Sequence, residues 1–348
     1  MTGDKMGNDR YYNEALGVIE EARKAINGEN EKYYNEALSV IEEVKKAVIG
    51  KDECVLLMMT AILAGGHILI DDIPGVGKTT LAIAFAKAMA LENIRTQFTP
   101  DVMPSDILGF TMYNKDTGSF YYQPGTVMCN LFLADEINRT SPKTQSALLE
   151  VMEENCVTVD GVARKVPQPF IVIATQNPSG SVGTQLLPES QLDRFMVCLS
   201  VGYPSLEDEI AIAKGKSNDI INLVNAVIDG EELINIRKKV NNIYIKDEVY
   251  KYICLLARET RVHPLIELGL SPRGTIALAN MSKAAAFLKG RDYVVPDDAA
   301  GVFNPVATHR ILLSSKARMS HTSAGEVLGQ IKAKIKKPRS VRSILDRD

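Results

Sequence analysis

The stretch DDIPGVGKTT, from Asp71 to Thr80, decides the fold. It follows the apolar run HILID, residues 67–71, and opens the helical stretch LAIAFAKAMA. Glycines with lysine and threonine between a strand and a helix are typical of a phosphate-binding loop, because backbone amides and the helix N-terminus then face an anion. Lys78 is expected to reach the β- and γ-phosphates, and the Thr79 hydroxyl to ligate Mg²⁺. An unrelated tight turn is the alternative interpretation.

Glycines in this loop let the backbone approach a phosphate, since no Cβ stands in the way. Asp72 occupies the position at which the eight-residue loop pattern has its first glycine. A carboxylate there must point away from the phosphates or be paired, so the loop geometry at Asp72 stays open. Nucleotide binding is assigned to six consecutive residues: Gly75, Val76, Gly77, Lys78, Thr79 and Thr80.

Two carboxylates follow a second buried strand. NLFLADEINR, from Asn130 to Arg139, is an apolar run that ends in Asp135 and Glu136. In a parallel sheet this end opens beside the phosphate loop. Asp135 is expected to hold Mg²⁺ through water, and Glu136 to orient or deprotonate the attacking water. The alternative is that both cap the turn after the strand, but the nearby phosphate loop favours hydrolysis over simple nucleotide holding.

A third strand, FIVIATQN, ends in Asn177. Its amide is placed to hydrogen-bond the γ-phosphate or the attacking water from the neighbouring strand. An asparagine before a proline is most often a turn residue, so this assignment depends on the other motifs.

Short strand-like runs alternate with helical stretches from residue 67 onward, which predicts an α/β fold with a parallel sheet covered by helices. Two inserted stretches, residues 110–122 and 157–166, resemble hairpins, and Asp160 and Gly161 suit the tight turn of the second. After residue 203 helical patterns dominate, so a second, all-helical domain is expected there. The clearest of these patterns are residues 251–261, 276–288 and 324–335.

The N-terminal part contains a duplication. YYNEALGVIEEARKAING, residues 11–28, recurs at an offset of 22 as YYNEALSVIEEVKKAVIG, residues 33–50, with thirteen of eighteen positions identical. Apolar residues at helical spacing, such as Leu38, Ile41 and Val44, predict an amphipathic helix that ends at a glycine in each copy. Either a local duplication added one helix in front of the domain, or the extra copy docks a partner.

Composition bounds the class of protein. The chain has 348 residues, which corresponds to about two domains, and its net charge of −3 argues against a protein that coats nucleic acid. Five cysteines without a CxxC pair suggest neither a zinc site nor a disulfide framework, so we expect thiols in a reducing cytoplasm. The first residues lack the apolar core of a secretion signal. The longest apolar stretch, residues 55–70, falls short of the roughly 20 residues that a membrane span needs.

Taken together, these strings resemble those of AAA+ ATPases of the MoxR type. The strings that carry the resemblance are IPGVGKT, FTPDVMPSDILGF, LFLADEINRTSPKTQSALLEVMEE, VIATQNP, LPESQLDRF and LSPRGTIAL. The resemblance implies a P-loop parallel-sheet core with two hairpin insertions, followed by a smaller all-α lid. Together with the duplication and the basic C-terminal end, it predicts four regions: N-terminal duplicated helices, residues 1–47; the AAA+ nucleotide-binding core, 48–203; the helical lid, 204–338; and a basic tail, 339–348.

The resemblance also implies roles for single residues. Arg194, in QLDRF, matches the arginine finger, which offers a cation to the transition-state phosphates of the neighbouring subunit. Arg273, in SPRGT, matches sensor 2, where it is expected to touch the γ-phosphate of its own subunit. From the residues alone, both are ordinary cations at helix ends. The remaining matches are Walker A at Lys78 and Thr79, Walker B at Asp135 and Glu136, and sensor 1 at Asn177.

Val48, Ile49 and Gly50 fall where the linker of this family packs on adenine, although they also form the end of the second repeat helix. Two strings depart from the family pattern. Gly269, Leu270 and Ser271 replace the usual Gly-Ala-Ser before the sensor 2 proline, and SGSVGTQLLPES, residues 179–190, is less acidic than is common.

The function that the resemblance implies is ATP hydrolysis with Mg²⁺ by a ring, expected to be a hexamer, that remodels or matures protein clients. A partner with a von Willebrand factor A domain commonly accompanies such proteins. One alternative is a remodeller of nucleic acid, which is less favoured because the hairpins carry little positive charge. Another is a scaffold that binds nucleotide without hydrolysis. The basic end KAKIKKPRSVRS is expected to be a solvated helix end and tail.

Overall fold

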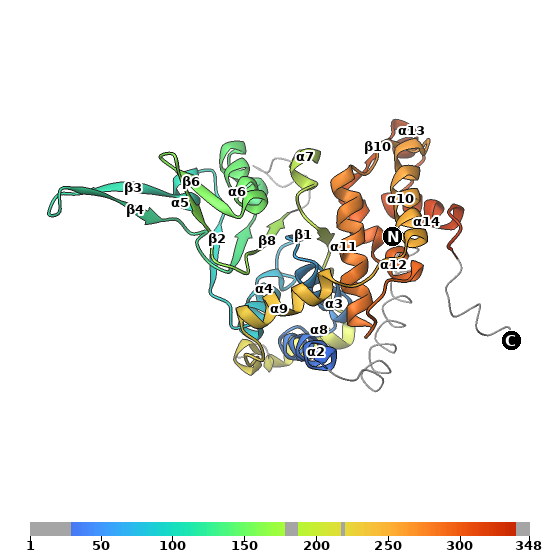
Figure 1. The fold of residues 1–348 in the computed structure, drawn as a ribbon, viewed down its shortest axis with the longest axis horizontal. Helices are drawn as coiled ribbons and strands as arrows, with labels where there is room; N and C mark the ends of the chain where they lie inside the picture. The colour runs from blue at the N-terminus through green and yellow to red at the C-terminus, as the bar shows by residue number, and fades with distance from the viewer. Residues whose placement is uncertain (1–28, 178–186, 217–219, 339–348) are drawn as a thin grey trace.

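A parallel sheet forms the centre of the molecule. The computed structural model describes residues 29–177, 187–216 and 220–338. Five strands lie in the order β2-β5-β8-β1-β9, and every pair is parallel (Figure 1). The central strands are buried on both faces, which explains their continuous apolar sequences. The bounds are β1 Ile68–Asp71, β2 Asn93–Gln97, β5 Leu131–Asp135, β8 Ile171–Gln176 and β9 Val197–Leu199.

Because the strands are parallel, the sheet has two chemically different edges. The carboxyl edge carries the residues that follow β1, β5 and β8, so the three predicted polar segments meet there. The amino edge carries the residues that precede the same strands, among them His67, Asn130 and Phe170. The helices and turns of this core are α3 Asp52–Leu63, α4 Lys78–Ala88, α5 Pro104–Leu108, η1 Ile137–Arg139, α6 Pro142–Glu154 and α7 Glu189–Leu192.

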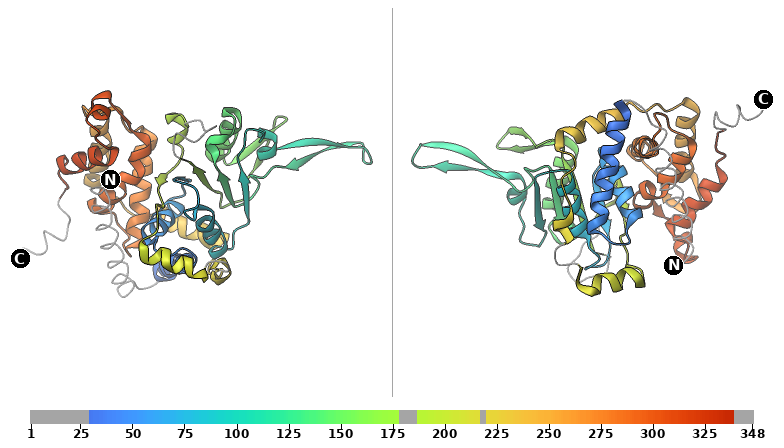
Figure 2. Two further views of the ribbon diagram at one scale, coloured as in Figure 1. Left: turned by 180° about the vertical axis from the view of Figure 1, so that it is seen from behind. Right: turned by 90° about the horizontal axis from the view of Figure 1, so that it is seen from below.

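Both predicted hairpins are present. The first consists of β3 (Gly109–Asn114) and β4 (Ser119–Pro124) and extends well away from the body in Figures 1 and 2. The second joins β6 (Cys156–Val159) to β7 (Val162–Lys165). Its turn residues have φ of 51° at Asp160 and 75° at Gly161, as a two-residue hairpin turn requires. The guanidinium of Arg164 lies 4.1 Å from the ring centroid of Tyr122, so the two hairpins touch at their bases.

Helices dominate the part of the chain that follows β9. One difference from expectation is a short antiparallel pair, β10 (Ile266–Leu268) and β11 (Leu312–Leu313), so the lid is helical but not all-α. Three-residue and two-residue strands are too short to show a period in sequence. The helices and turns are α8 Leu206–Ala211, η2 Ile212–Lys216, η3 Ile220–Leu223, α9 Gly230–Asn241, α10 Asp247–Val262, α11 Pro272–Leu288, α12 Pro296–Ala307, η4 Thr308–Arg310, α13 Ser315–Met319 and α14 Ala324–Lys334.

The second copy of the duplication forms α2 (Glu29–Ala47), and the glycine after it, Gly50, has a φ of 70°. The amphipathic helix predicted for this copy is confirmed, whereas the first copy lies outside the described residues. The apolar face of α2 is fully buried against α3, α4, α9 and α11. Tyr34, for example, meets Phe287 of α11 edge to face at 6.3 Å. The helix is therefore an integral part of the core.

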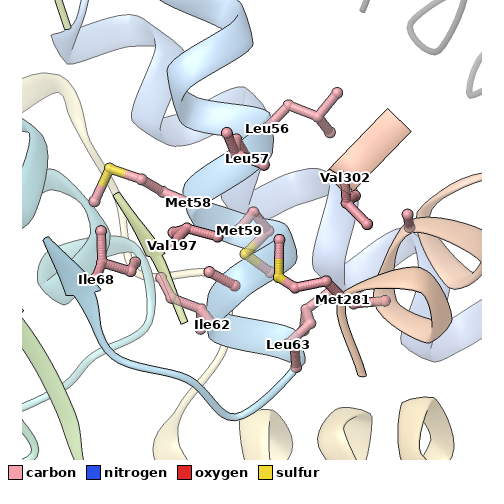
Figure 3. Close-up of a cluster of buried hydrophobic side chains, with 14 of the residues drawn as sticks. Leu56, Leu57, Met58, Met59, Ile62, Leu63, Ile68, Val197, Met281 and Val302 are labelled. Carbon is pink, nitrogen blue, oxygen red and sulfur yellow. The ribbon is translucent and has the colours of Figure 1, made fainter. Parts of the chain in front are cut away.

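Helix α3 joins the sheet to the lid. It is apolar on all sides, as expected for a helix that is buried all round. Figure 3 shows Met59 and Ile62 between Val197 of β9 and Met281 of α11, and all four are buried. One hydrophobic cluster therefore runs from the sheet through α3 into the lid. This packing sets the position of the lid helices relative to the sheet.

Candidate active site

The phosphate loop follows β1 at the carboxyl edge. Gly75 and Gly77 have φ of 86° and 91°, and an added Cβ at either position would meet no atom within 4 Å. The backbone conformation, rather than close packing, therefore requires glycine. Lys78 begins α4, and its Nζ donates to the carbonyl of Asp72 at 2.6 Å and to that of Gln176 at 3.3 Å. Burial lowers the pKa of Lys78, although nearby carboxylates, Asp72 first, oppose the shift.

The Asp72 carboxylate is paired rather than exposed to the loop. Oδ2 accepts from Ser200 Oγ at 2.9 Å and from the Gly202 amide at 2.6 Å, and Oδ1 accepts from the Ile73 amide at 2.8 Å. The side chain is buried and is directed toward the segment after β9. Asp72 therefore ties the phosphate loop to that segment, which answers the question raised by its sequence position.

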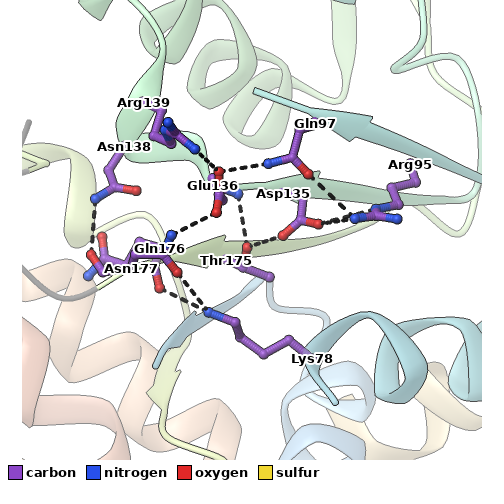
Figure 4. A network of polar contacts seen from close by, with 10 residues as sticks. All are labelled: Lys78, Arg95, Gln97, Asp135, Glu136, Asn138, Arg139, Thr175, Gln176 and Asn177. Carbon is purple, nitrogen blue, oxygen red and sulfur yellow. Dashed lines mark hydrogen bonds and ion pairs between the residues drawn. The ribbon is translucent and has the colours of Figure 1, made fainter. Parts of the chain in front are cut away.

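Asp135 is the last residue of β5 and is held from both sides (Figure 4). Thr175 Oγ1 donates to its Oδ1 at 2.5 Å. Arg95, on the neighbouring strand β2, donates to Oδ2 from Nε at 3.1 Å and from Nη2 at 2.6 Å. Of the roughly four lone-pair positions of a carboxylate, these three contacts leave about one for a further ligand. The orientation of Asp135 is thus fixed by its own sheet.

Glu136 leaves the strand with a φ of 56°, a left-handed conformation that is rare outside glycine. Its amide donates to Thr175 Oγ1 at 2.9 Å, so this threonine holds the carboxylate of Asp135 and the backbone of Glu136. Its Oε2 accepts from Gln97 Nε2 at 2.8 Å and from Arg139 Nη1 at 2.7 Å. The unusual backbone conformation therefore holds a carboxylate in a defined position at the sheet edge.

Asn177 connects the lysine to the glutamate. Its Oδ1 accepts from Lys78 Nζ at 3.4 Å, and its Nδ2 donates to Glu136 Oε1 at 2.7 Å (Figure 4). Burial alone would raise the pKa of Glu136, but hydrogen bonds from Arg139 and Asn177 outweigh it, so the pKa lies below its usual value. Glu136 is accordingly a carboxylate at neutral pH, as a base must be.

The donor set suits Mg²⁺ bound together with a nucleotide. Asp135 and Thr79 offer hard oxygen ligands, and Mg²⁺ in such sites takes one or two protein oxygens plus phosphate oxygens and water. In the parts of the chain described above, no group of three or more His, Cys, Asp or Glu side chains gathers as a metal cage. Thr80 is the third residue of α4, and Val76 packs against the main hydrophobic cluster.

The expected adenine-contacting segment lies beside this loop. Val48 is buried, Ile49 packs against the same cluster as Val76, and Gly50 follows α2. The next residue, Lys51, donates to the carbonyl of Gly202 at 3.0 Å, and the Gly202 amide binds Asp72. Gly202 therefore links this segment to the phosphate loop. Whether the segment binds adenine stays a prediction.

Comparison with known proteins agrees with this geometry. The family model described as "ATPase family associated with various cellular activities (AAA)" matches residues 67–197, and the model described as "AAA lid domain" matches residues 258–331. Chaperone MoxR1 of Mycobacterium tuberculosis is 34% identical over 80% of this chain and 76% of its own length. The chain belongs to the MoxR-type AAA+ ATPase family. Protein MoxR of Methylorubrum extorquens, 29% identical over 75% of this chain, is a further relative.

Two other comparisons cover most of this MoxR-family chain. YeaC of Bacillus subtilis, described as uncharacterized, is 44% identical over 82% of this chain and 90% of its own length. A crystal structure from Cytophaga hutchinsonii, whose protein is named a candidate ATPase, superposes with a TM-score of 0.82 at 36% identity. The superposition covers 93% of this chain and 99% of that one. The expected AAA+ fold, with a parallel-sheet core and a helical lid, is therefore confirmed, and the chain is an ATPase of this family.

The two predicted arginines of this MoxR-family ATPase lie at the amino edge, opposite Lys78. Arg194 and Arg273 share one carboxylate, Glu153, at the end of α6; Arg194 Nη1 lies 2.8 Å from Glu153 Oε2, and Arg273 pairs with Oε1. The expectation that Arg273 reaches the γ-phosphate of its own subunit is therefore wrong for this conformation. The reason is the packing of α11 on α3, which places the start of α11 beside Gly66, just before β1.

Arg194 nevertheless lies on a surface that a neighbour can reach. Its side chain is 31% exposed, and its Nη1 donates to the carbonyl of Leu149 at 2.8 Å. It borders a cavity of about 480 Å³ whose walls include Ser146, Glu150 and Gln191. The first string that departs from the family pattern, Gly269 to Ser271, still ends in a normal helix cap. Ser271 accepts from the Gly274 amide at 3.0 Å at the start of α11. Residues 179–186 of the second departing string lie outside the described residues.

Sequence analysis missed several residues of the site: Arg95, Gln97, Arg139, Glu153, Thr175 and Gly202. Arg95 and Gln97 alternate on β2 toward the carboxylates after β5, and this alternation was the one signal in the sequence that could have indicated them.

None of the helices in the described part of the chain combines the length and apolar character that a bilayer crossing needs.

Proposed function

We propose that this MoxR-family chain hydrolyses ATP with Mg²⁺ in a ring of identical subunits, a hexamer, in which the arginines of one subunit complete the site of the next. One observation carries the proposal: Lys78, Asp135 and Glu136 lie at the carboxyl edge of the sheet, whereas Arg194 and Arg273 lie at the amino edge. Two complementary but different surfaces on one subunit form head-to-tail contacts, and such contacts close into rings.

At the carboxyl edge each side chain has one task. The loop amides and Lys78 hold the phosphates, while Thr79 and Asp135 hold Mg²⁺, which neutralises charge on the β- and γ-phosphates when bound. Glu136, kept ionised by its neighbours, accepts a proton from the attacking water. Asn177 lies between Lys78 and Glu136 and positions that water relative to the γ-phosphate.

At the amino edge the arginines supply positive charge. A guanidinium donated by a neighbour stabilises transition-state charge and contributes roughly 10³ to 10⁵ in rate in comparable phosphoryl-transfer systems. Within one subunit Arg194 and Arg273 both pair with Glu153, so the two guanidinium groups are held next to each other. A neighbour's triphosphate would compete with that carboxylate. Hydrolysis therefore requires assembly.

The work of the ring is remodelling of a protein client, as the name of Chaperone MoxR1 suggests for that relative. The β3–β4 hairpin supports this, because it projects from the body and exposes large apolar side chains. Phe120 is 73% exposed and Tyr113, its ring neighbour at 5.1 Å, is 53% exposed. Contiguous exposed apolar surface indicates a protein-binding site. A partner with a von Willebrand factor A domain belongs to the same proposal.

The alternative of nucleic-acid remodelling has less support. The hairpin that projects farthest carries Lys115 and Asp116 at its tip, which cancel, so no basic track follows the strands. The alternative of a scaffold without hydrolysis is opposed by the ordered Glu136 and Asn177. A cytoplasmic site of action is also proposed, supported by the five cysteines, all of which are free thiols.

Mixing two inactive variants tests the proposal. A Lys78→Ala subunit cannot hold phosphate but keeps its arginines, whereas an Arg194→Ala subunit keeps its phosphate loop. Each alone should lose at least about 100-fold in ATP turnover. Mixed at equal concentration, they should recover a clear fraction of the unaltered rate, because some interfaces combine an intact loop with an intact arginine.

Three observations would overturn this proposal. The first is an Arg194→Ala protein that hydrolyses ATP at the unaltered rate. The second is a mixture no more active than its components, although mass measurement with ATP shows mixed rings. The third is a particle mass of a single subunit in the presence of ATP, in a protein that still turns ATP over.

A further inference from the structure

A further arginine, partly buried, faces the amino edge and has no assigned task. Arg237, on α9, donates from Nε to the carbonyl of Ile62 at 2.8 Å, at the end of α3. Its Nη2 is fully buried and has no hydrogen-bond partner among the described residues. Burial lowers the pKa of the guanidinium to about 10, so it remains charged at neutral pH. A charge held away from water without an acidic partner raises the free energy of the folded state, so a bound ligand or a structural role must compensate for it.

Neighbouring groups do not supply the missing negative charge. His67 is close, but burial first and Arg237 second hold its pKa at about 4, so the ring is neutral. The Asp193 carboxylate is occupied, since it accepts from Arg310 Nε at 2.8 Å and from Ser271 Oγ at 2.8 Å. Glu153 is occupied by the pair of arginines described above. Within residues 29–338, excluding the undescribed segments, Arg237 has no ion pair.

Arg237 opens into a cavity that the other arginines share. The cavity has a volume of about 330 Å³ and lies where the residues before β1 meet α9 and α11. Polar groups converge on it from the core and from the lid: Arg194, Arg237, Arg273, Arg310, Gln168 and Asn280. Four arginines against the two carboxylates of Asp193 and Glu153 leave an excess of positive charge, and guanidinium groups bind phosphate through paired N–H donors.

Of these four arginines, Arg310 is already satisfied. Besides Asp193, it donates to the carbonyls of Met196 at 2.9 Å and Val306 at 2.6 Å, and to that of Phe195. Arg310 thus joins η4 to the segment before β9 and is a structural residue. Arg237 differs because its side chain lines the cavity without an acidic partner among the described residues, and its buried Nη2 has no acceptor.

We propose that Arg237 is a third phosphate-binding arginine at this cavity, one that contacts a phosphate oxyanion alongside Arg194 and Arg273. The phosphate has two conceivable sources: the triphosphate of the adjoining subunit, or a free phosphate-bearing molecule. The first source rests on the proposed function, since it needs the head-to-tail assembly. Arg237 is fixed by the Ile62 carbonyl, so its donors are ordered before the anion arrives, which lowers the entropic cost of binding.

The test uses Arg237→Gln and Arg237→Lys, with Arg318→Gln as the matched control. Arg318 is a 54% exposed lid arginine that faces Glu267, away from the cavity. At concentrations at which the protein is assembled, Arg237→Gln should lower kcat by about 100-fold, the cost of one lost transition-state donor, while Arg318→Gln changes kcat less than twofold. Arg237→Lys should restore part of the loss, because it keeps the charge but not the paired donors.

Mixing two variants tests whether Arg237 contacts the triphosphate of the adjoining subunit or has another role. Arg237→Gln subunits keep their phosphate loop, and Lys78→Ala subunits keep their cavity, so their mixture should recover activity if Arg237 acts across the interface. For the free-phosphate source, pyrophosphate is titrated into Lys78→Ala protein, and an added Arg237→Gln change should weaken binding at least about tenfold. Rescue indicates the adjoining triphosphate, and pyrophosphate binding without rescue indicates a free anion.

The inference is overturned if Arg237→Gln leaves kcat unchanged and pyrophosphate binding is also unchanged. It is equally overturned if kcat falls but neither rescue nor loss of pyrophosphate binding occurs, since Arg237 is then structural. If Arg194→Ala is rescued by Lys78→Ala and Arg237→Gln is not, the proposed ring mechanism stands and the adjoining-triphosphate role of Arg237 fails. Melting curves and particle mass of each variant exclude unfolding as the cause.

Discussion

Asn177 Nδ2 lies 2.7 Å from Glu136 Oε1, while the other end of the same amide accepts from Lys78. The side chain that directly follows β8 therefore spans the lysine after β1 and the carboxylate after β5. The order of the strands makes this possible, since β8 lies between β5 and β1. Glu136, the proposed base, and Lys78, the proposed phosphate-binding residue, are thus held relative to each other by the residue that follows the central strand of the sheet.

Replacing Glu136 with glutamine should stop hydrolysis without stopping binding. The amide keeps the size of the side chain and one acceptor oxygen, so it can retain one of the hydrogen bonds donated by Gln97 and Asn177, but it cannot accept a proton at neutral pH. ATP turnover should fall at least about 100-fold, and ATP affinity should change less than about threefold. Phosphate release and nucleotide titration measure the two quantities. Turnover at the unaltered rate in Glu136→Gln would remove Glu136 as the base.

The fall of kcat at low pH should depend on the hydrogen bonds that Glu136 accepts. Its pKa lies below the usual glutamate value because hydrogen bonds from Arg139 and Asn177 outweigh burial. The active form is the carboxylate, so activity is lost only as the pH falls through that lowered pKa. Arg139→Gln removes one of the contacts that lower the pKa, and the acid limb of kcat should move to higher pH.

A matched control is Arg318→Gln, which leaves Glu136 untouched and should leave the limb in place. Circular dichroism at each pH separates loss of the base from loss of the fold. An acid limb that does not move in Arg139→Gln, in protein that stays folded, would show that another group sets it.

Replacing Asp72 with the glycine of the common loop pattern should lower the free energy of unfolding. In an Asp72→Gly variant the Gly202 amide and the Ser200 hydroxyl lose their acceptor, and a buried donor left without a partner costs about 1–3 kcal/mol. Asp72→Asn keeps one acceptor and should cost less. Urea unfolding measures the free energies, with Asp116→Asn on the exposed hairpin as control. A more stable Asp72→Gly protein would contradict the role assigned to this carboxylate.

Either copy of the duplication should be able to complete the core. Deleting residues 29–50 fuses the first copy to Lys51 in the register of the second. Six of the eight buried side chains of residues 33–50 have identical counterparts 22 positions earlier; Val44 and Val48 become alanine and isoleucine. The shortened chain should unfold cooperatively, with a melting temperature lower by about 5 °C owing to the lost methyl groups at position 44.

The control for this deletion carries Leu16→Asp, which places a charge at the position equivalent to buried Leu38. That variant should lose its cooperative transition. If the two shortened chains melt alike, or if neither folds, the first copy does not replace the second.

Most of the carboxyl edge could be predicted from sequence. Asp135, Glu136 and Asn177 each end an apolar run, and the geometry of parallel strands brings such ends together. The residues that orient them could not be found in the same way. The alternation on the edge strand β2 places Gln97 on one face but does not say that it contacts Glu136, and Thr175 lies inside a buried run, where nothing in the sequence sets it apart from an ordinary strand residue.

The amino edge was predicted less well for a physical reason. Motif positions identify Arg194 and Arg273 but not the side of the sheet to which the lid attaches. That side depends on the packing of α3 between Val197 and Met281, a contact between segments far apart in the chain. Nor does any sequence pattern mark Glu153, one acidic residue among several near the end of α6.

Glu153 has a consequence for a subunit on its own. By holding Arg194 and Arg273 on its two oxygens, it keeps both cations partly neutralised until something more anionic arrives. In the proposed ring, phosphate-bearing molecules in solution would compete with that carboxylate for the two arginines, whereas a neighbour's Mg-bound triphosphate would meet them at a high effective concentration. Glu153, at the end of α6, therefore opposes the binding of other anions to Arg194 and Arg273 in an isolated subunit, and its displacement frees both arginines together.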